Sequence, residues 1–110
     1  SPESAALREA REEAGIEAQI VGFLGVQNHA RSDGEGTVYL IFLCQHVAGE
    51  PQADSQETDR AAYLSLAQMD ALDEPIDEFC RWVVERVLSG CHQTIPSCAD
   101  TPYAPYLAFL

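Results

Sequence analysis

The chain has 110 residues, of which 46% are hydrophobic and 22% charged, a composition typical of a single globular domain and unlike that of disordered or fibrous chains. Its six basic residues, all arginine, are outnumbered by eighteen acidic ones, and a net charge of −12 excludes the clustered basic surface that nucleic acids and anionic membranes require. No apolar stretch approaches the ~20 residues of a membrane helix. We therefore expect no nucleic-acid partner and no membrane partner, whereas a metal-dependent enzyme is compatible with this charge.

The first segment is expected to be a helix. Ser1 is a suitable N-cap, Pro2 fits the first helical position, and Glu3 adds an acid to the first turn. Strong helix formers fill residues 5–14, and Gly15 is a typical residue for the end of a helix.

Two strands separated by a loop are expected next. Residues 20–26 are apolar and interrupted by two glycines, which predicts a strand with a bend or bulge. Residues 28–36 are polar and contain glycine, which predicts a loop. Residues 37–47 (TVYLIFLCQHV) form the strongest strand pattern, and their nearly continuous β-branched and aromatic side chains predict burial on both faces.

The second half of the chain predicts a short strand and two helices. The strand covers residues 60–66, where Ser65 can cap a short helix. Pro75 opens a longer helix, whose apolar residues recur at helical spacing until Gly90 closes it. Trp82 belongs to this apolar stripe and is expected to be buried.

The order of these elements predicts an α/β or α+β domain over residues 1–90. About three strands make a thin sheet, since sheets usually have ~4–6. Residues 91–110 contain three prolines and three aromatic residues, and we expect an irregular tail that packs on the domain or on a partner.

The four cysteines are too few for a disulfide scaffold. No basic and then apolar leader opens the sequence, so we expect reduced thiols and a cytoplasmic location. A zinc site with His92 between Cys91 and Cys98 is an alternative, but this spacing matches no common zinc pattern.

Three acidic side chains of the first helix share one face, because Glu9, Glu12 and Glu13 follow i, i+3, i+4 spacing. Each like-charge pair costs roughly 0.2–0.5 kcal/mol on an isolated helix. A hard cation such as Mg²⁺ or Mn²⁺ would reverse this repulsion, since it prefers carboxylate ligands. Arg8 lies one turn before Glu12 and can hold it by a charge-assisted hydrogen bond. A solvated acidic helix face is the alternative.

The order of residues on this helix resembles the Nudix box, G-x5-E-x7-R-E-U-x-E-E-x-G-U, in which U is a bulky aliphatic residue. Six residues fall on its fixed positions: Arg8, Glu9, Glu12, Glu13, Gly15 and Ile16. Ala10 occupies a U position with a smaller side chain than usual. The resemblance extends over roughly residues 1–88, through a G-E-P turn and a Y-L-S-L segment. The first glutamate of the box would immediately precede Ser1, so we expect the box and the family's preceding strands to begin upstream of this chain.

The resemblance implies an α/β/α sandwich around a mixed sheet, with the N-terminal strands missing from this chain. It also implies a hydrolase that cleaves a nucleoside diphosphate linked to another moiety. In this family, water attacks a phosphorus of the pyrophosphate, and Mg²⁺ or Mn²⁺ is the cofactor. The expected partner is thus a small nucleotide.

The resemblance also implies roles for particular residues. Glu9, Glu12 and Glu13 match the metal-binding glutamates, and Arg8 matches the arginine that orients them. Glu57 precedes the Y-L-S-L segment by six residues and can join the site as a ligand or general base, with a solvated loop acid as the alternative. The expected catalytic residues are therefore Arg8, Glu12, Glu13 and Glu57.

Four further residues are candidates for substrate contacts. His29 and His46 can contact a substrate, although a histidine at the surface or at a strand end is the favoured interpretation. Tyr39 and Phe42 can stack on a base, although core packing is favoured for both.

Two other interpretations of the whole chain are kept. One is an inactive Nudix-like binding module, or a fragment that needs a complementary segment. The other is an unrelated acidic α/β adaptor in which the match to the box is accidental. The sheet edge left exposed by the missing strands predicts self-association or β-pairing with another chain, so we expect a homo-oligomer.

Overall fold

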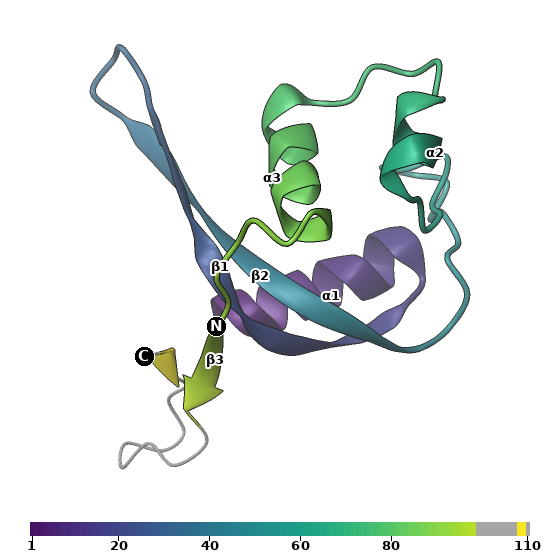
Figure 1. The fold of residues 1–110 in the computed structure, drawn as a ribbon, viewed down its shortest axis with the longest axis horizontal. Helices are drawn as coiled ribbons and strands as arrows, with labels where there is room; N and C mark the ends of the chain where they lie inside the picture. The colour runs from purple at the N-terminus through teal and green to yellow at the C-terminus, as the bar shows by residue number, and fades with distance from the viewer. Residues whose placement is uncertain (99–107, 110) are drawn as a thin grey trace. The chain divides into compact units, whose positions relative to one another are not determined.

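The computed structural model describes residues 1–98 and 108–109. Its elements follow in this order: α1 (Pro2–Ala14), β1 (Glu17–Ala30), β2 (Gly36–Ala48), α2 (Leu66–Asp70), α3 (Glu78–Leu88), β3 (Ile95–Cys98) and β4 (Ala108–Phe109) (Figure 1). The chain divides into two compact units, of which the second comprises Ala62–Gln93. The first unit holds the remaining described residues. Helices combined with a sheet confirm the expected α/β class.

Helix α1 begins and ends where the sequence predicts. The Ser1 side chain accepts a hydrogen bond from the Ser4 backbone N–H at 3.2 Å, which satisfies one of the free donors at the helix start. Gly15 ends the helix in the left-handed conformation (φ 70°, ψ 17°), which glycine adopts without strain. Its N–H donates to the Arg11 carbonyl at 3.1 Å. The chain therefore leaves the helix directly into β1.

Strands β1 and β2 form an antiparallel hairpin that is longer than predicted. The ladder continues through His29↔Thr37 to Ala30↔Gly36, so the loop is shortened to residues 31–35. The polar sequence of this part predicted a loop, but ladder hydrogen bonds join backbone groups and do not depend on apolar side chains. In Figure 1 the hairpin loop projects away from α1.

The pairing of β1 with β2 shifts register three times. The shifts fall between Glu17 and Ala18, between Ile20 and Gly22, and between Phe23 and Gly25. Each extra residue at a bulge reverses the face on which the following side chains lie. For this reason the apolar residues of β1 do not alternate regularly along the sequence.

The sheet order is β2-β1-β3-β4, and each described strand pair is antiparallel. β3 and β4 correct the expectation of a wholly irregular tail over residues 91–110. β3 joins β1 through Gly22↔Pro96 and Phe23↔Ile95. Pro96 suggested irregular structure, but a strand this short tolerates a proline where no ladder donor is needed. The rest of that expectation, on residues 99–107 and 110, lies outside the described residues.

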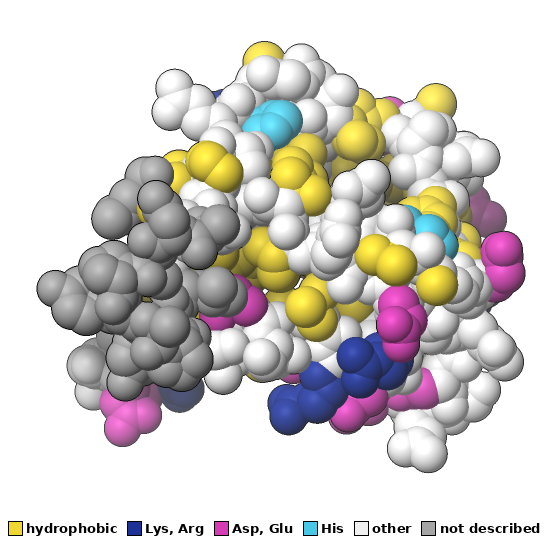
Figure 2. Space-filling view, turned by 90° about the horizontal axis from the view of Figure 1, so that it is seen from below, with side chains coloured by type: hydrophobic (Ala, Val, Ile, Leu, Met, Phe, Trp, Pro, Cys, Tyr) yellow, Lys and Arg dark blue, Asp and Glu magenta, His cyan; other side chains and the backbone are white. Residues whose placement is uncertain are grey.

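The expected burial of residues 37–47 on both faces is wrong. Within the described residues, no hydrophobic side chain is fully buried, and Tyr39 and Leu40 are 52% and 43% exposed. Hydrophobic side chains accordingly reach the surface in the view of Figure 2. A β-branched and aromatic pattern reports strand propensity, whereas burial also requires a second layer on each face, which the first unit does not supply to β2.

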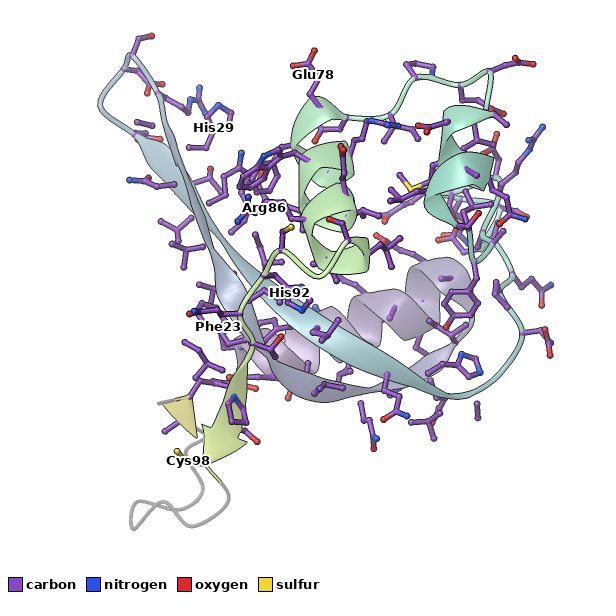
Figure 3. All side chains as sticks on the ribbon, viewed as in Figure 1. Phe23, His29, Glu78, Arg86, His92 and Cys98 are labelled. Atoms are coloured by element: carbon purple, nitrogen blue, oxygen red, sulfur yellow. The ribbon has the colours of Figure 1, made fainter. Side chains whose placement is uncertain are left out.

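Three phenylalanines hold the centre of the sheet together. The ring of Phe23 packs edge-to-face on Phe42 with centroids 5.7 Å apart, and Phe109 lies 5.8–6.0 Å from both. Figure 3 labels Phe23 close to β3. The cluster joins β1, β2 and β4, which agrees with the packing role favoured for Phe42.

The expected strand over residues 60–66 is wrong, because no described strand pairs with this segment and a strand needs a ladder partner. Ser65 instead caps α2, as predicted, in a capping box with Gln68. Asp70 forms an ion pair with Arg81 of α3.

Helix α3 begins at Glu78, three residues after the predicted Pro75, because the carboxylate of Asp77 caps it by accepting from the Cys80 N–H at 3.0 Å. Figure 3 shows Glu78 in its first turn and Arg86 in its last, the arrangement that suits the helix dipole. Trp82 is 54% exposed and not buried as expected. The Arg86 guanidinium lies 5.1 Å from its ring centroid, a cation–π contact.

The cap at Asp77 yields a test of the second unit. Hydrogen bonds from backbone N–H groups hold the pKa of Asp77 below its ordinary value, so the cap contributes stability above about pH 4 and loses it as the pH falls. We expect Asp77→Ala to lower the melting temperature by about 4–8 °C at pH 7. Asp77→Asn, a capping residue without charge, should retain most of this stability and remove its dependence on acid. Calorimetry of the three chains between pH 3 and 7 measures both effects, and equal melting temperatures would contradict the cap.

None of the described helices is long and apolar enough to span a membrane. All four cysteines have free thiols, three of them exposed.

Candidate functional site

The glutamates predicted as metal ligands lie on α1, with Glu13 in its last turn. Arg8 Nε lies 3.8 Å from Glu12 Oε1, the partner expected from the sequence. Both side chains are 63% exposed, and exposed pairs at this spacing contribute only ~0.3–0.5 kcal/mol. The pair therefore orients Glu12 more than it stabilises the helix.

A loop of five residues, 54–58, folds around the carboxylate of Asp54. Asp54 Oδ1 accepts hydrogen bonds from the backbone N–H groups of Gln56, Glu57 and Thr58 at 2.9–3.1 Å. These bonds, with the one from Thr58 first, keep the pKa of Asp54 below its ordinary value. We call residues 54–58 the Asp54 loop.

Two hydrogen bonds tie this part of the chain to the end of α1. The Thr58 hydroxyl donates to the Glu13 carbonyl oxygen at 2.9 Å, and the Gln52 N–H donates to the Ala14 carbonyl oxygen at 2.7 Å. The last carbonyls of a helix have no partner within the helix, so both bonds satisfy groups that would otherwise need water. The Asp54 loop is thereby fixed against the last turn of α1.

This arrangement brings Glu57 to Glu13, although 44 positions separate them in sequence. Their carboxyl groups share a hydrogen bond, which is the main cause of a raised pKa at Glu13. Desolvation and the negative charges of Glu57, Glu9 and Asp54 raise it further. The last turn of α1 therefore carries a concentration of negative charge.

The donor chemistry of this region fits a hard divalent cation, because all the available ligands are carboxylate oxygens whose repulsion a cation would relieve. The Glu13–Glu57 pair is the part of such a site that is assembled. Glu12 is directed to Arg8, and the described residues contain no group of three or more carboxylate, histidine or cysteine side chains arranged to hold a metal. This also leaves the alternative zinc site around His92 without a ligand set.

The four candidate substrate contacts do not gather at these carboxylates. His29 lies near the hairpin loop (Figure 3), and His46 lies at the opposite end of the hairpin, paired with Ala18. Phe42 is engaged in the phenylalanine cluster, whereas Tyr39 is exposed on β2.

Sequence reasoning missed Asp54, Thr58 and Gln52, which connect the Asp54 loop and the segment before it to α1. An aspartate followed within four residues by threonine is a weak signal for a loop closed by side-chain-to-backbone hydrogen bonds. The contact of Thr58 with Glu13 spans 45 positions, so no local pattern could reveal it.

Comparison with known families agrees with this geometry. The family model of the NUDIX domain matches residues 1–83, which include α1, the hairpin and the Asp54 loop. The chain therefore belongs to the NUDIX family. No curated protein and no solved structure matches it. Membership of this family indicates a hydrolase.

Proposed function

We propose that the chain hydrolyses a nucleoside diphosphate linked to another moiety, with Mg²⁺ or Mn²⁺ as cofactor. The observation that carries this proposal is the attachment of the Asp54 loop, which contains Glu57, to the last turn of the Nudix-type helix, where the Thr58 hydroxyl donates to the Glu13 carbonyl oxygen at 2.9 Å. A chain with a net charge of −12 repels a pyrophosphate, and a cation between the two would relieve this repulsion.

In this proposal, the residues of α1 bind and orient the cofactor. Glu9, Glu12 and Glu13 would hold the cation, and Arg8 would keep the Glu12 carboxylate in place. A bound cation neutralises phosphate oxygens and makes a nearby water more acidic. Glu57, whose carboxyl lies beside a ligand residue, would join the ligands of the cation or accept the proton of the attacking water.

The test is hydrolysis by this chain of ADP-ribose, nucleoside triphosphates, dinucleoside polyphosphates and nucleotide sugars. Each substrate is incubated with Mg²⁺, with Mn²⁺ or with EDTA, in water enriched in ¹⁸O. We expect cleavage of at least one substrate, loss of cleavage in EDTA, and one ¹⁸O in a phosphate product. Label in a sugar product, or cleavage that persists in EDTA, would contradict water attack on phosphorus assisted by a cation.

A second candidate is an inactive NUDIX-type binding module. It is favoured by the finding that no three-ligand group is assembled in the described residues. The two candidates differ in one result, because a binding module would retain nucleotides in equilibrium dialysis and release no product.

We also propose that the chain associates with a second copy of itself through β2. Among the described strands, β2 pairs only with β1, and no charged residue occurs from Gly36 to Ala48. In so acidic a chain, this uncharged edge is where two copies meet with the least repulsion.

We expect light scattering to show a dimer whose fraction increases with salt, because salt screens the net charge. Leu40→Lys should favour the monomer, whereas Ser32→Lys, the same charge change in the loop, should not. A monomer at every salt concentration would contradict this proposal.

The four free thiols support a reducing compartment, and we propose the cytoplasm as the place of the reaction.

A further inference from the structure

We propose that Asp54 and Thr58 are positioning residues that hold the Glu57 carboxyl beside Glu13. This inference rests on the proposed function, in which Glu13 and Glu57 take part. Neither positioning residue needs to contact the substrate or the cation, since each acts through the backbone of the Asp54 loop.

The first step of the argument concerns the conformation of the loop. Three consecutive N–H groups, from Gln56 to Thr58, converge on one oxygen of Asp54. The loop also contains Ser55 at φ 62°, a left-handed conformation that residues with a side chain rarely adopt. Such a conformation persists only where neighbouring interactions impose it. The Asp54 carboxylate thus determines the direction in which the Glu57 side chain leaves the loop.

The second step concerns the attachment of the loop to α1. The Thr58 hydroxyl has one proton, and the shorter distance assigns it to the Glu13 carbonyl (2.9 Å) over Asp54 Oδ1 (3.1 Å). The same hydroxyl accepts from the Asp54 N–H at 3.3 Å. Thr58 therefore links the two ends of the Asp54 loop to Glu13, whose carboxyl group lies beside that of Glu57. Without this link, only the Gln52–Ala14 hydrogen bond, which precedes the loop, ties this segment to α1, and nothing fixes the Glu57 side chain beside Glu13.

The test is a double-mutant cycle on Mn²⁺ affinity, measured by electron paramagnetic resonance without substrate. Thr58→Val keeps the shape of the side chain and removes the hydroxyl. We expect it to weaken Mn²⁺ binding ~10-fold, the lower end of the range for residues that orient metal ligands. Thr58→Ser should restore the affinity. In a Glu57→Gln background, Thr58→Val should have little further effect, because its target carboxylate is absent.

Thr37→Val is the matched control, since it makes the same change on β2 and should leave Mn²⁺ affinity unchanged. Equal losses from Thr58→Val in both backgrounds would overturn the positioning role, as would failure of Thr58→Ser to restore binding. Thermal unfolding identifies any variant that has merely lost its fold. If the unsubstituted chain binds no Mn²⁺, the proposed function fails together with this inference. If it binds Mn²⁺ and Thr58→Val binds equally well, only this inference fails.

Discussion

Glu13→Gln is expected to reduce cation-dependent hydrolysis by ~10²–10⁴-fold, the range typical of a lost acid–base or ligand carboxylate. The substitution keeps the length of the side chain and its capacity for a hydrogen bond with Glu57, and removes the negative charge. Initial rates with the best substrate of the panel measure the effect. The matched control is Glu3→Gln, the same change in the first turn of α1, which should leave the rate unchanged.

The same substitution should not destabilise the cation-free chain and can stabilise it. The raised pKa of Glu13 means that the folded state loses stability as the pH rises through this pKa, because the two carboxylates then repel each other. Glu13→Gln removes this loss, so the variant should melt no lower than the parent at pH 7. A variant that is inactive because it is unfolded would be recognised by a lower melting temperature, and retention of full activity in a folded variant would refute the role of Glu13.

Gly22→Ala is expected to have the largest effect on the first unit. Gly22 is buried, and a Cβ at this position would lie 2.5 Å from Thr94 Cγ2 and 2.7 Å from the Ile95 carbonyl oxygen. The Ile95 oxygen is a backbone atom, so β1 and β3 would have to shift apart to make room for the Cβ. We expect a loss of about 1–3 kcal/mol in the free energy of unfolding, the usual cost of overpacking. Urea denaturation followed by circular dichroism measures it.

Gly36→Ala provides the comparison for this prediction. A Cβ at Gly36 would lie 3.1 Å from the His29 carbonyl oxygen, which requires a shift of only a few tenths of an ångström. The free energy of unfolding should therefore fall less than for Gly22→Ala. Equal losses for the two variants would show that the close approach of β3 at Gly22 does not restrict the side chain at this position.

Local chemistry explains which elements could be predicted. Ser1 and Gly15 delimit α1, and Ser65 caps α2, because capping depends on residues within a few positions of each other. The sequence predicts that α3 starts at Pro75, but the helix begins at Glu78 because the side chain of Asp77 caps it there. The strand expected over residues 60–66 failed because strand formation depends on a distant partner.

The candidate site also has a part that the sequence could predict and a part that it could not. The pattern of glutamates around Glu13 is local to one helix, so the sequence could indicate its chemistry. Glu57 was found from its spacing to the Y-L-S-L segment, but its contact with Glu13 depends on Thr58 and Asp54. Hydrogen bonds between a loop and a helix end 45 positions away follow from the tertiary fold alone.

The three register shifts of the β1–β2 hairpin have a consequence for the order of folding. From Gly25↔Ile41 to the loop, the ladder is regular, whereas all three shifts lie nearer the helix. The loop-side half can close from contacts between neighbours in sequence, which form within ~1–10 μs in hairpins. The bulged half has several competing alignments, and only one continues a ladder that already exists. The regular half therefore serves as the template that selects the native alignment of the rest.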